Sequence, residues 1–262
     1  MNNLREMQPE DIAKVFAVIE SQDEDDAEEA AAGYQAIGGI MDNYVMEANG
    51  KIIGVTGFAT PPGCDETHWL NWTYIHDDYA NQGNGRIMLN ELIQHLKDKD
   101  ARMLFVKVSD YIDEEDGAIY AAALHLYKSL GFVEQIVHKD YYDDGESQTI
   151  LALRLKDEVS DNSSSTEENC PVKFTALFEI AETDGAYSFG WDDEGDALFT
   201  QEDVEVGITQ ARKDKARVVF LSFPQNYSKV NKTLLASGFK YSGKLKDYFE
   251  DGIDEDHYTY VL

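Results

Sequence analysis

Hydrophobic and polar positions along the first half of the chain follow two different periods, and together they predict mixed strands and helices. Four apolar, β-prone runs have the spacing of strands: 44–47, 52–58, 69–75 and 103–108. Two other segments place apolar side chains at every third or fourth position, as helices do: 85–97 and 118–130. The pair Asn49-Gly50 lies between the first two runs and is typical of a type I′ hairpin turn.

Further elements are predicted at the beginning and at the end of this half. A short strand at 4–7 leads into a helix from Pro9, a residue that suits the first helical turn. A second helical region follows over 27–37, and a last hairpin turns at Asp144-Gly145.

The second half predicts a shorter series of the same elements. A hairpin turns at Asp184-Gly185, and the rest follows in order: a helix from about Gln201, a strand at 217–223, a helix over 227–236 and a final hairpin. The polar, serine-rich segment 157–171 separates the halves and is typical of a linker.

Landmarks recur in both halves. Gly131-Phe132 is matched by Gly238-Phe239, and a turn glycine follows 14 residues after the first glycine of each pair, at Gly145 and Gly252. We therefore interpret the chain as a tandem duplication with domains at 1–156 and 172–262.

The second copy is degenerate. Leu234 stands where the first copy has Tyr127, and Leu198-Phe199-Thr200 stands where the first copy has Gly83-Asn84-Gly85. This copy also lacks the length for the first strand and the first two helices, so we interpret it as a non-catalytic partner domain.

Composition narrows the class of protein. With 262 residues, 43% of them hydrophobic, the chain is long enough to bury a sizeable core. Its formal charge of -29 argues against nucleic acid or an anionic membrane as a partner. The two cysteines, Cys64 and Cys170, imply neither a disulfide framework nor a metal site. The first residues lack the apolar core of a signal peptide, and no run suits a bilayer, so we expect a cytoplasmic protein.

The strand at 69–75 leads through a glycine-containing turn into the helix at 85–97. This order brings the free N–H groups of a helix start to one point, where the helix dipole favours an anion. We expect Gly83 and Gly85 both to have positive φ there.

Two motifs resemble those of the GNAT (Gcn5-related) N-acetyltransferases. Residues 75–85, Ile-His-Asp-Asp-Tyr-Ala-Asn-Gln-Gly-Asn-Gly, resemble the family's acyl-CoA loop, and residues 126–132, Leu-Tyr-Lys-Ser-Leu-Gly-Phe, resemble its helix end. The resemblance covers residues 3–155. Ala80 stands where the family usually has Arg or Gln, and Asp77 replaces the usual Pro.

The resemblance implies an α/β (α+β) fold of two GNAT-like domains, each a mixed twisted sheet flanked by helices, with the second truncated. It also implies acetyl-CoA as co-substrate, held in the gap between two parallel strands, at 69–75 and 103–108, that splay apart. The residues expected to contact it are Tyr74, Ile75, His76, Asn81, Gln82, Gly83, Asn84, Gly85 and Arg86.

The implied reaction is direct transfer to an amine. Tyr127 is the candidate general acid, since a phenol can donate a proton to a departing thiolate; the alternative is a core aromatic. The base stays open among Glu66, His68 and Asn71, of which Asn71 could hold a relaying water. No metal is expected.

The acceptor is expected to be a small cationic amine. Two acidic segments, 23–29 and 140–146, should cover the acceptor side and focus a negative potential, although the acidity could equally cover the whole surface. Four residues are candidates for acceptor binding: Asp25, Asp26, Trp72 and Tyr141. A homodimer is possible. The alternative function is a non-catalytic acyl-CoA-binding or scaffold protein.

Overall fold

The computed structural model describes residues 3–262 apart from 37, 65, 114–116, 158–171 and 193–199. Its strands form two sheets, with the orders β1-β2-β3-β4-β5-β7-β6 and β11-β12-β10-β9-β8. The chain divides into two compact units, of which the first holds 1–106, 125–132 and 153–157. Most of the predicted linker, together with Cys170, Leu198 and Phe199, lies outside the described residues, and the predicted domain boundaries stay predictions.

The first unit begins with a strand, two helices and a hairpin. In chain order these elements are β1 (Asn3–Glu6), the 3₁₀ turn η1 (Pro9–Asp11), α1 (Ile12–Glu20), α2 (Glu24–Gln35), β2 (Asn43–Ala48) and β3 (Lys51–Ala59). The predicted type I′ turn is confirmed between β2 and β3, because Asn49 and Gly50 both have positive φ, 53° and 76°.

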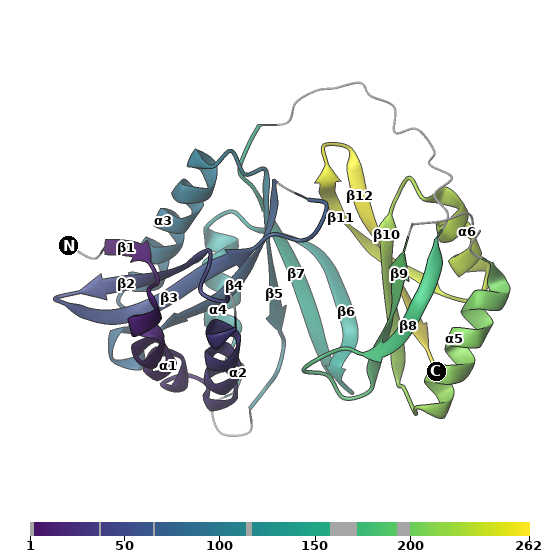
Figure 1. Cartoon of the computed structure of the whole chain (residues 1–262), viewed down its shortest axis with the longest axis horizontal. Helices are drawn as coiled ribbons and strands as arrows, with labels where there is room; N and C mark the ends of the chain where they lie inside the picture. Colours follow the sequence, from purple (N-terminus) through teal and green to yellow (C-terminus); the bar gives the residue numbers. More distant parts are fainter. Residues whose placement is uncertain (1–2, 37, 65, 114–116, 158–171, 193–199) are drawn as a thin grey trace. The chain divides into compact units, whose positions relative to one another are not determined.

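Helices cover both faces of these strands (Figure 1). Val45 of β2 packs in a cluster with α1 and α2, whereas the next residue, Met46, packs against Met88 of α3 (Asn84–Asp98). Neighbouring residues of a strand point to opposite faces. The sheet is therefore buried on both sides, which explains why β2 and β3 are apolar almost throughout.

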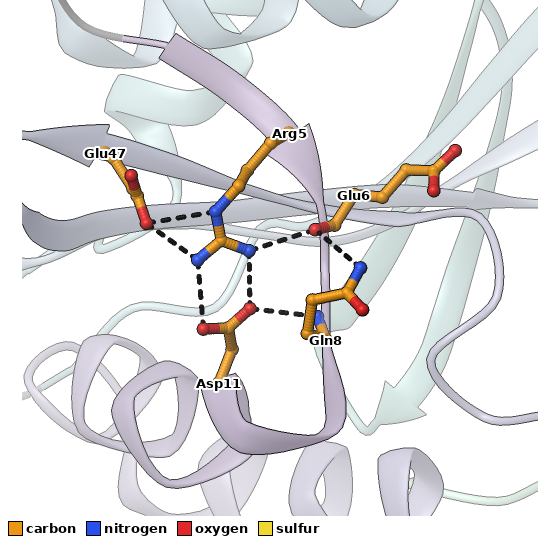
Figure 2. A network of polar contacts seen from close by, with 5 residues as sticks. All are labelled: Arg5, Glu6, Gln8, Asp11 and Glu47. Carbon is orange, nitrogen blue, oxygen red and sulfur yellow. Dashed lines mark hydrogen bonds and ion pairs between the residues drawn. The ribbon is translucent and has the colours of Figure 1, made fainter.

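A network around Arg5 joins β1 to the start of the first helix (Figure 2). The Arg5 guanidinium donates two hydrogen bonds to Asp11, at 2.6 and 3.0 Å, and two to Glu47 Oε1, at 3.0 and 2.7 Å. Asp11 Oδ2 also accepts the backbone N–H of Gln8 at 2.9 Å. Because Asp11 is only 2% exposed, this paired carboxylate fixes the entry of the chain into α1.

Four elements follow in the order expected from the sequence: β4 (Thr67–Ile75), α3, β5 (Met103–Ser109) and α4 (Ala121–Ser129). A 3₁₀ turn, η2 (Asp77–Tyr79), links β4 to α3. The helix predicted at 118–130 is shorter than expected at its start, because residues 119–120 form a turn and α4 begins at Ala121.

The second unit contains the hairpin β6 (Val133–Asp143) and β7 (Glu146–Arg154, of which 146–152 belong here) and all of the five-stranded sheet. The elements of that sheet and its helices are β8 (Lys173–Glu179), β9 (Ala186–Asp192), α5 (Gln201–Lys213), β10 (Val218–Pro224), α6 (Ser228–Ala236), β11 (Lys240–Glu250) and β12 (Ile253–Val261). They match the predicted series of hairpin, helix, strand, helix and hairpin.

The β6–β7 hairpin packs against this second sheet. Tyr141 joins an apolar cluster that includes Val218 and Phe220 of β10. His138 Nε2 lies 3.1 Å from His257 Nδ1, and burial lowers the pKa of His138 to about 3, so this imidazole is neutral. The hairpin thus covers one face of the second sheet, while α5 and α6 contribute to a separate apolar cluster of that unit.

Candidate active site

Strands β4 and β5 are parallel neighbours that pair only at one end. Their pairing runs from Thr67 opposite Met103 to Trp69 opposite Phe105. The pairing with β5 stops at Trp69, although β4 continues to Ile75. Its register with β3 shifts by one residue between Asn71 and Tyr74, which marks a β-bulge. Bulges re-aim strands and are frequent next to active sites.

At the end of β4, the main-chain N–H and C=O groups of successive residues point to opposite sides of the strand. The N–H of His76 donates to Ile53 O of β3 at 2.9 Å, and its carbonyl accepts the Tyr79 N–H at 2.8 Å. Since main-chain groups alternate in direction along a strand, the amide groups of Ile75 point away from β3. Ile75 therefore offers a free edge on the side where β5 has stopped pairing.

The turn before α3 is held by its own side chains. Asn84 Nδ2 donates to Tyr79 O and Gln82 Nε2 donates to Asp78 O, both at 2.9 Å. Asn81 and Gly83 take positive φ values of 57° and 84°. The buried Asn84 is a structural residue of this turn, which fixes the direction in which α3 begins.

The N-terminus of α3 has no cap of its own. Gly83 occupies the cap position and provides no side-chain cap hydrogen bond, and the first turn contains no acidic residue. Such a helix start stabilises a bound anion through its N–H groups and its dipole. Arg86 adds a cation in this turn, and its Nη2 donates to Ser129 Oγ of α4 at 2.6 Å.

The expectation of positive φ at Gly85 was wrong. Gly85 is the second residue of α3 and has helical geometry, because the left-handed step is taken by Gly83. A side chain at Gly85 would be crowded for another reason. A Cβ there would lie 3.3 Å from Leu126 Cδ2 of α4, so the glycine allows the two helices to approach closely.

Tyr127 of α4 is 7% exposed, and its ring packs against Phe132 with the centroids 5.5 Å apart. Its hydroxyl makes no hydrogen bond within the described residues. Burial raises the pKa of this phenol, so it keeps its proton at neutral pH. A protonated hydroxyl that has no acceptor among the described residues can donate a hydrogen bond to a ligand.

Asp26 and Tyr74 are joined by a hydrogen bond that the sequence did not suggest. The Tyr74 hydroxyl of β4 donates to Asp26 Oδ2 in the first turn of α2. Trp72 lies in the same cluster of partly buried residues against α1 and α2, whereas Asp25 is exposed. Asp26 and Tyr74 are 48 positions apart in the sequence, and only the packing of α2 on the sheet brings them together.

Two of the three candidate bases, Glu66 and His68, lie at the end of β4 that is opposite Ile75. Glu66 precedes β4, at the opposite end from Ile75, and forms ion pairs with Lys156 and Arg102 at 3.6 and 3.9 Å. His68 is buried with Nδ1 2.9 Å from Thr60 Oγ1, and burial lowers its pKa. Asn71 is half-buried on β4 beside the bulge.

Tyr141 belongs to the second unit, where its ring packs on Phe220 and His138. The acids of the β6–β7 turn also have partners there: Asp140 accepts the Gly145 N–H at 2.9 Å, and Glu146 accepts the Ser109 hydroxyl at 2.5 Å. The two acidic segments expected at the acceptor side therefore fall in separate units.

The part of the chain that the structure describes contains no cluster of three His, Cys, Asp or Glu side chains arranged to hold a metal ion. None of its helices combines the length and apolarity needed to cross a bilayer.

Comparisons with known proteins converge on one family. Residues 41–134 match the model of the acetyltransferase (GNAT) domain. The ribosomal protein bS18-alanine N-acetyltransferase of Escherichia coli K12 is 35% identical over 117 residues, which is 43% of this chain and 71% of that protein. The Salmonella typhimurium protein of the same name is 32% identical over 84 residues, 31% of this chain and 51% of its own.

Among solved structures, a GNAT-family chain from Desulfovibrio desulfuricans superimposes with a TM-score of 0.52 and 22% identity, over 60% of this chain and all of its own. At that identity the match shows the fold alone. It agrees with the mixed α/β architecture described above.

Proposed function

Because the chain belongs to the GNAT family of acetyl-CoA-dependent N-acyltransferases, we propose that its first half transfers the acetyl group of acetyl-CoA to an amine. The observation that carries this proposal is the uncapped start of α3 next to the unpaired end of β4. An extended pantetheine arm can pair with a strand edge, and a pyrophosphate can bind a helix start.

In this proposal, donor binding depends mainly on the main chain. The Ile75 amide groups pair with the pantetheine arm, and the N–H groups of residues 82–86 hold the pyrophosphate. Ala80 removes a side chain that the family often has at this turn, yet it leaves those N–H groups in place. Arg86 supplies the positive charge closest to them in sequence.

The transfer itself needs an acid for the leaving group. The amine attacks the thioester carbon, the C–N bond forms, and the C–S bond breaks. Tyr127 is our candidate to protonate the departing sulfur, because its buried phenol keeps its proton and lacks a partner in the described residues.

The proposed acceptor is a cationic amine. The start of α2 contributes Glu24, Asp25 and Asp26, and Asp23 caps the helix by accepting the Asp26 N–H at 3.0 Å. A concentration of carboxylates beside β4 attracts positive charge. The relatives named above act on an alanine amine of a ribosomal protein, which is a second acceptor of the same chemistry.

We further propose that the second half is a duplicated copy without an acetyl-CoA site. The strand order β6-β7-β5-β4-β3 recurs as β11-β12-β10-β9-β8, with β4–β5 and β9–β10 as the parallel pairs. Gly131 and Gly238 have φ values of 97° and 96°, and Asp140 and Asp247 have values of 52° and 53°.

Equivalent hydrogen bonds support the same proposal. The Gly145 N–H donates to Asp140 Oδ1 at 2.9 Å, and the Gly252 N–H donates to Asp247 Oδ1 at 2.9 Å. A common ancestor of the two hairpins accounts for this repetition of a backbone irregularity.

The start of α5 differs from that of α3 in its chemistry. Thr200 caps α5, and its side chain and N–H exchange hydrogen bonds with Asp203 in a capping box. Glu202 and Asp203 add negative charge to this first turn. Thr200 already accepts the Asp203 N–H of this helix start, and the negative charge of the first turn opposes an anion.

A thiol-release assay with acetyl-CoA tests the proposed activity. The acceptors are spermidine, kanamycin, an N-terminally blocked peptide containing lysine, and a peptide that begins with alanine. We expect transfer to at least one of these amines. The rate with spermidine should fall between 0.1 and 1 M salt, as the screening length shortens from about 10 to about 3 Å.

If acetyl-CoA binds but none of the four amines is acetylated, the alternative of a non-catalytic acyl-CoA-binding protein takes the place of the proposed enzyme. Transfer that is insensitive to salt keeps the enzyme but removes the electrostatic argument for a cationic acceptor.

A further inference from the structure

Asp26 is a half-buried carboxylate without a cation beside it. Its Oδ2 accepts the Tyr74 hydroxyl, while Oδ1 makes no hydrogen bond within the described residues. It forms no ion pair with any described residue, in contrast to Asp11, which is held by the Arg5 guanidinium. Withdrawing a carboxylate from water without a counter-charge is costly. A ligand cation would offset that cost.

The surroundings of Asp26 are acidic as well as apolar. Burial is the main cause that raises its pKa, and the carboxylates of Asp23, Glu29 and Asp25 on the same helix raise it further. The Tyr74 hydroxyl acts in the opposite direction and lowers the pKa by stabilising the charged form. A carboxylate balanced in this way accepts a proton more readily than an exposed one.

We propose that Asp26 is the general base that takes a proton from the amine acceptor, and that Tyr74 positions it. This inference rests on the proposed acetyltransferase function. Tyr74 immediately precedes Ile75, whose amide groups face the unpaired side of β4. The Asp26–Tyr74 hydrogen bond therefore holds the proposed base next to the strand that is proposed to bind acetyl-CoA. The segment that matches the family model begins at residue 41, after Asp26.

The other candidate bases are less suited. Glu66 is already paired with Lys156 and Arg102, and His68 is buried with a bond to Thr60. The amide of Asn71 has no basic site. Among these residues, Asp26 combines a carboxylate, partial burial and an oxygen that makes no hydrogen bond within the described part of the chain.

The acceptor ammonium must lose two protons in the reaction, and the leaving sulfur must gain one. The acceptor ammonium gives one proton to Asp26 Oδ1, and the neutral nitrogen then forms the C–N bond. When the C–S bond breaks, the sulfur takes the phenolic proton of Tyr127. The nitrogen loses its second proton to water, and Tyr127 and Asp26 exchange protons with solvent. The net products are the acetamide, CoA thiol and one proton.

The first test is Asp26→Asn, which keeps the size of the side chain and an oxygen that can accept the Tyr74 hydroxyl. With the fastest amine of the four-member panel, kcat/KM at pH 7 should fall about 100- to 1,000-fold. Acetyl-CoA affinity, measured by calorimetry, should stay within twofold. The loss should shrink as the pH approaches the pKa of the amine, because a free amine needs no base.

A matched control removes an acid from a neighbouring helix. Glu20 is exposed at the end of α1 and has no described partner, so Glu20→Gln changes the net charge by the same amount. Its kcat/KM should stay within twofold of the wild-type value, which separates a local proton transfer from a change in overall charge.

The second variant, Tyr74→Phe, tests the positioning role. Removing the hydroxyl takes away the bond that lowers the pKa of Asp26. The acidic limb of the kcat/KM profile should therefore move to higher pH, a shift that a purely structural residue would not cause. This variant also decides the question if Asp26→Asn fails to fold.

The outcomes are distinguishable. A wild-type protein that acetylates no panel amine contradicts the proposed function itself. A wild-type protein that does acetylate one, together with an Asp26→Asn variant within threefold of it at every pH, overturns the role of Asp26 and leaves the enzyme intact. An acidic limb that is unmoved in Tyr74→Phe overturns the positioning role.

Discussion

At the scale of single residues, Tyr127 is a buried phenol that packing alone does not explain, because its hydroxyl has no described hydrogen-bond partner. Tyr127→Phe keeps the ring and its contact with Phe132. If the phenol protonates the leaving thiolate, kcat should fall about 10²- to 10⁴-fold with little change in acetyl-CoA affinity. Steady-state kinetics and a calorimetric titration measure the two effects separately.

Tyr258 provides the control for that substitution. It is another buried tyrosine with a raised pKa, and it lies in the second unit. Tyr258→Phe should leave turnover within twofold. A Tyr127→Phe enzyme that is equally active at all pH values would make Tyr127 a packing residue.

Asp11 gives a prediction on stability. Hydrogen bonds from Arg5 are the main cause that lowers the pKa of Asp11. A lowered folded-state pKa means that the carboxylate stabilises the fold above its unfolded pKa of about 3.9, and that this contribution is lost as the pH falls further. Asp11→Asn should cost about 1.5–3 kcal/mol at pH 7.

Chemical denaturation between pH 7 and pH 2 measures this difference. The destabilisation of Asp11→Asn relative to wild type should diminish toward pH 2, whereas the exposed acid Glu20, changed to Gln, should have little effect at either pH. A cost that is independent of pH would mean that the Arg5 pair does not supply the stability.

The sequence suggested candidate site residues where a short, continuous motif contains them. Gly83 and Tyr127 each lie within a short motif, and Gly83 has the predicted positive φ of 84°. The Asp26–Tyr74 bond could not be predicted, because it depends on how α2 packs against β4 across 48 positions. The sequence suggested Asp26 for binding the amine acceptor and Tyr74 for binding acetyl-CoA, without linking the two residues.

At the scale of elements, the start of α3 carries the proposed donor site, and Gly83 controls its shape. Gly83→Val should weaken acetyl-CoA binding at least tenfold, because a β-branched residue is strained at a φ of 84°. Gly252 is a matched control: it has the same φ and equally open surroundings, in the β11–β12 turn. Gly252→Val should reduce stability comparably while leaving acetyl-CoA affinity unchanged.

Calorimetry and thermal unfolding of both variants separate the two effects. Equal loss of acetyl-CoA affinity in Gly83→Val and Gly252→Val would indicate general destabilisation and would remove the special role of the α3 start.

Element types were predictable where the pattern was strong. The hairpins turned where their Asn-Gly and Asp-Gly pairs predicted, and α5 begins at Gln201 as expected. Gly85 was mispredicted because the sequence does not reveal which glycine of a Gly-x-Gly turn precedes the helix and which lies inside it. Its actual constraint, the approach of Leu126, comes from α4 and appears only in the packed structure.

At the scale of the whole molecule, the two halves repeat a strand order but differ at one helix start. Gly83 leaves α3 uncapped, while Thr200 and Asp203 close the start of α5. The glycine spacing of the sequence predicted a repeat, which stays a proposal. The capping box was not identified from the sequence, although Thr200 and Asp203 have the spacing that forms one. This difference is the physical basis for expecting one functional copy.

Isothermal titration of acetyl-CoA into the full-length protein tests this account most directly. The account predicts saturable binding of acetyl-CoA with a stoichiometry close to one per chain. In Gly83→Val, this binding should be lost or weakened at least tenfold. Two equivalent sites per chain would show that the second copy binds the co-substrate despite its capped helix. An absence of binding would contradict the proposed donor site in the first copy.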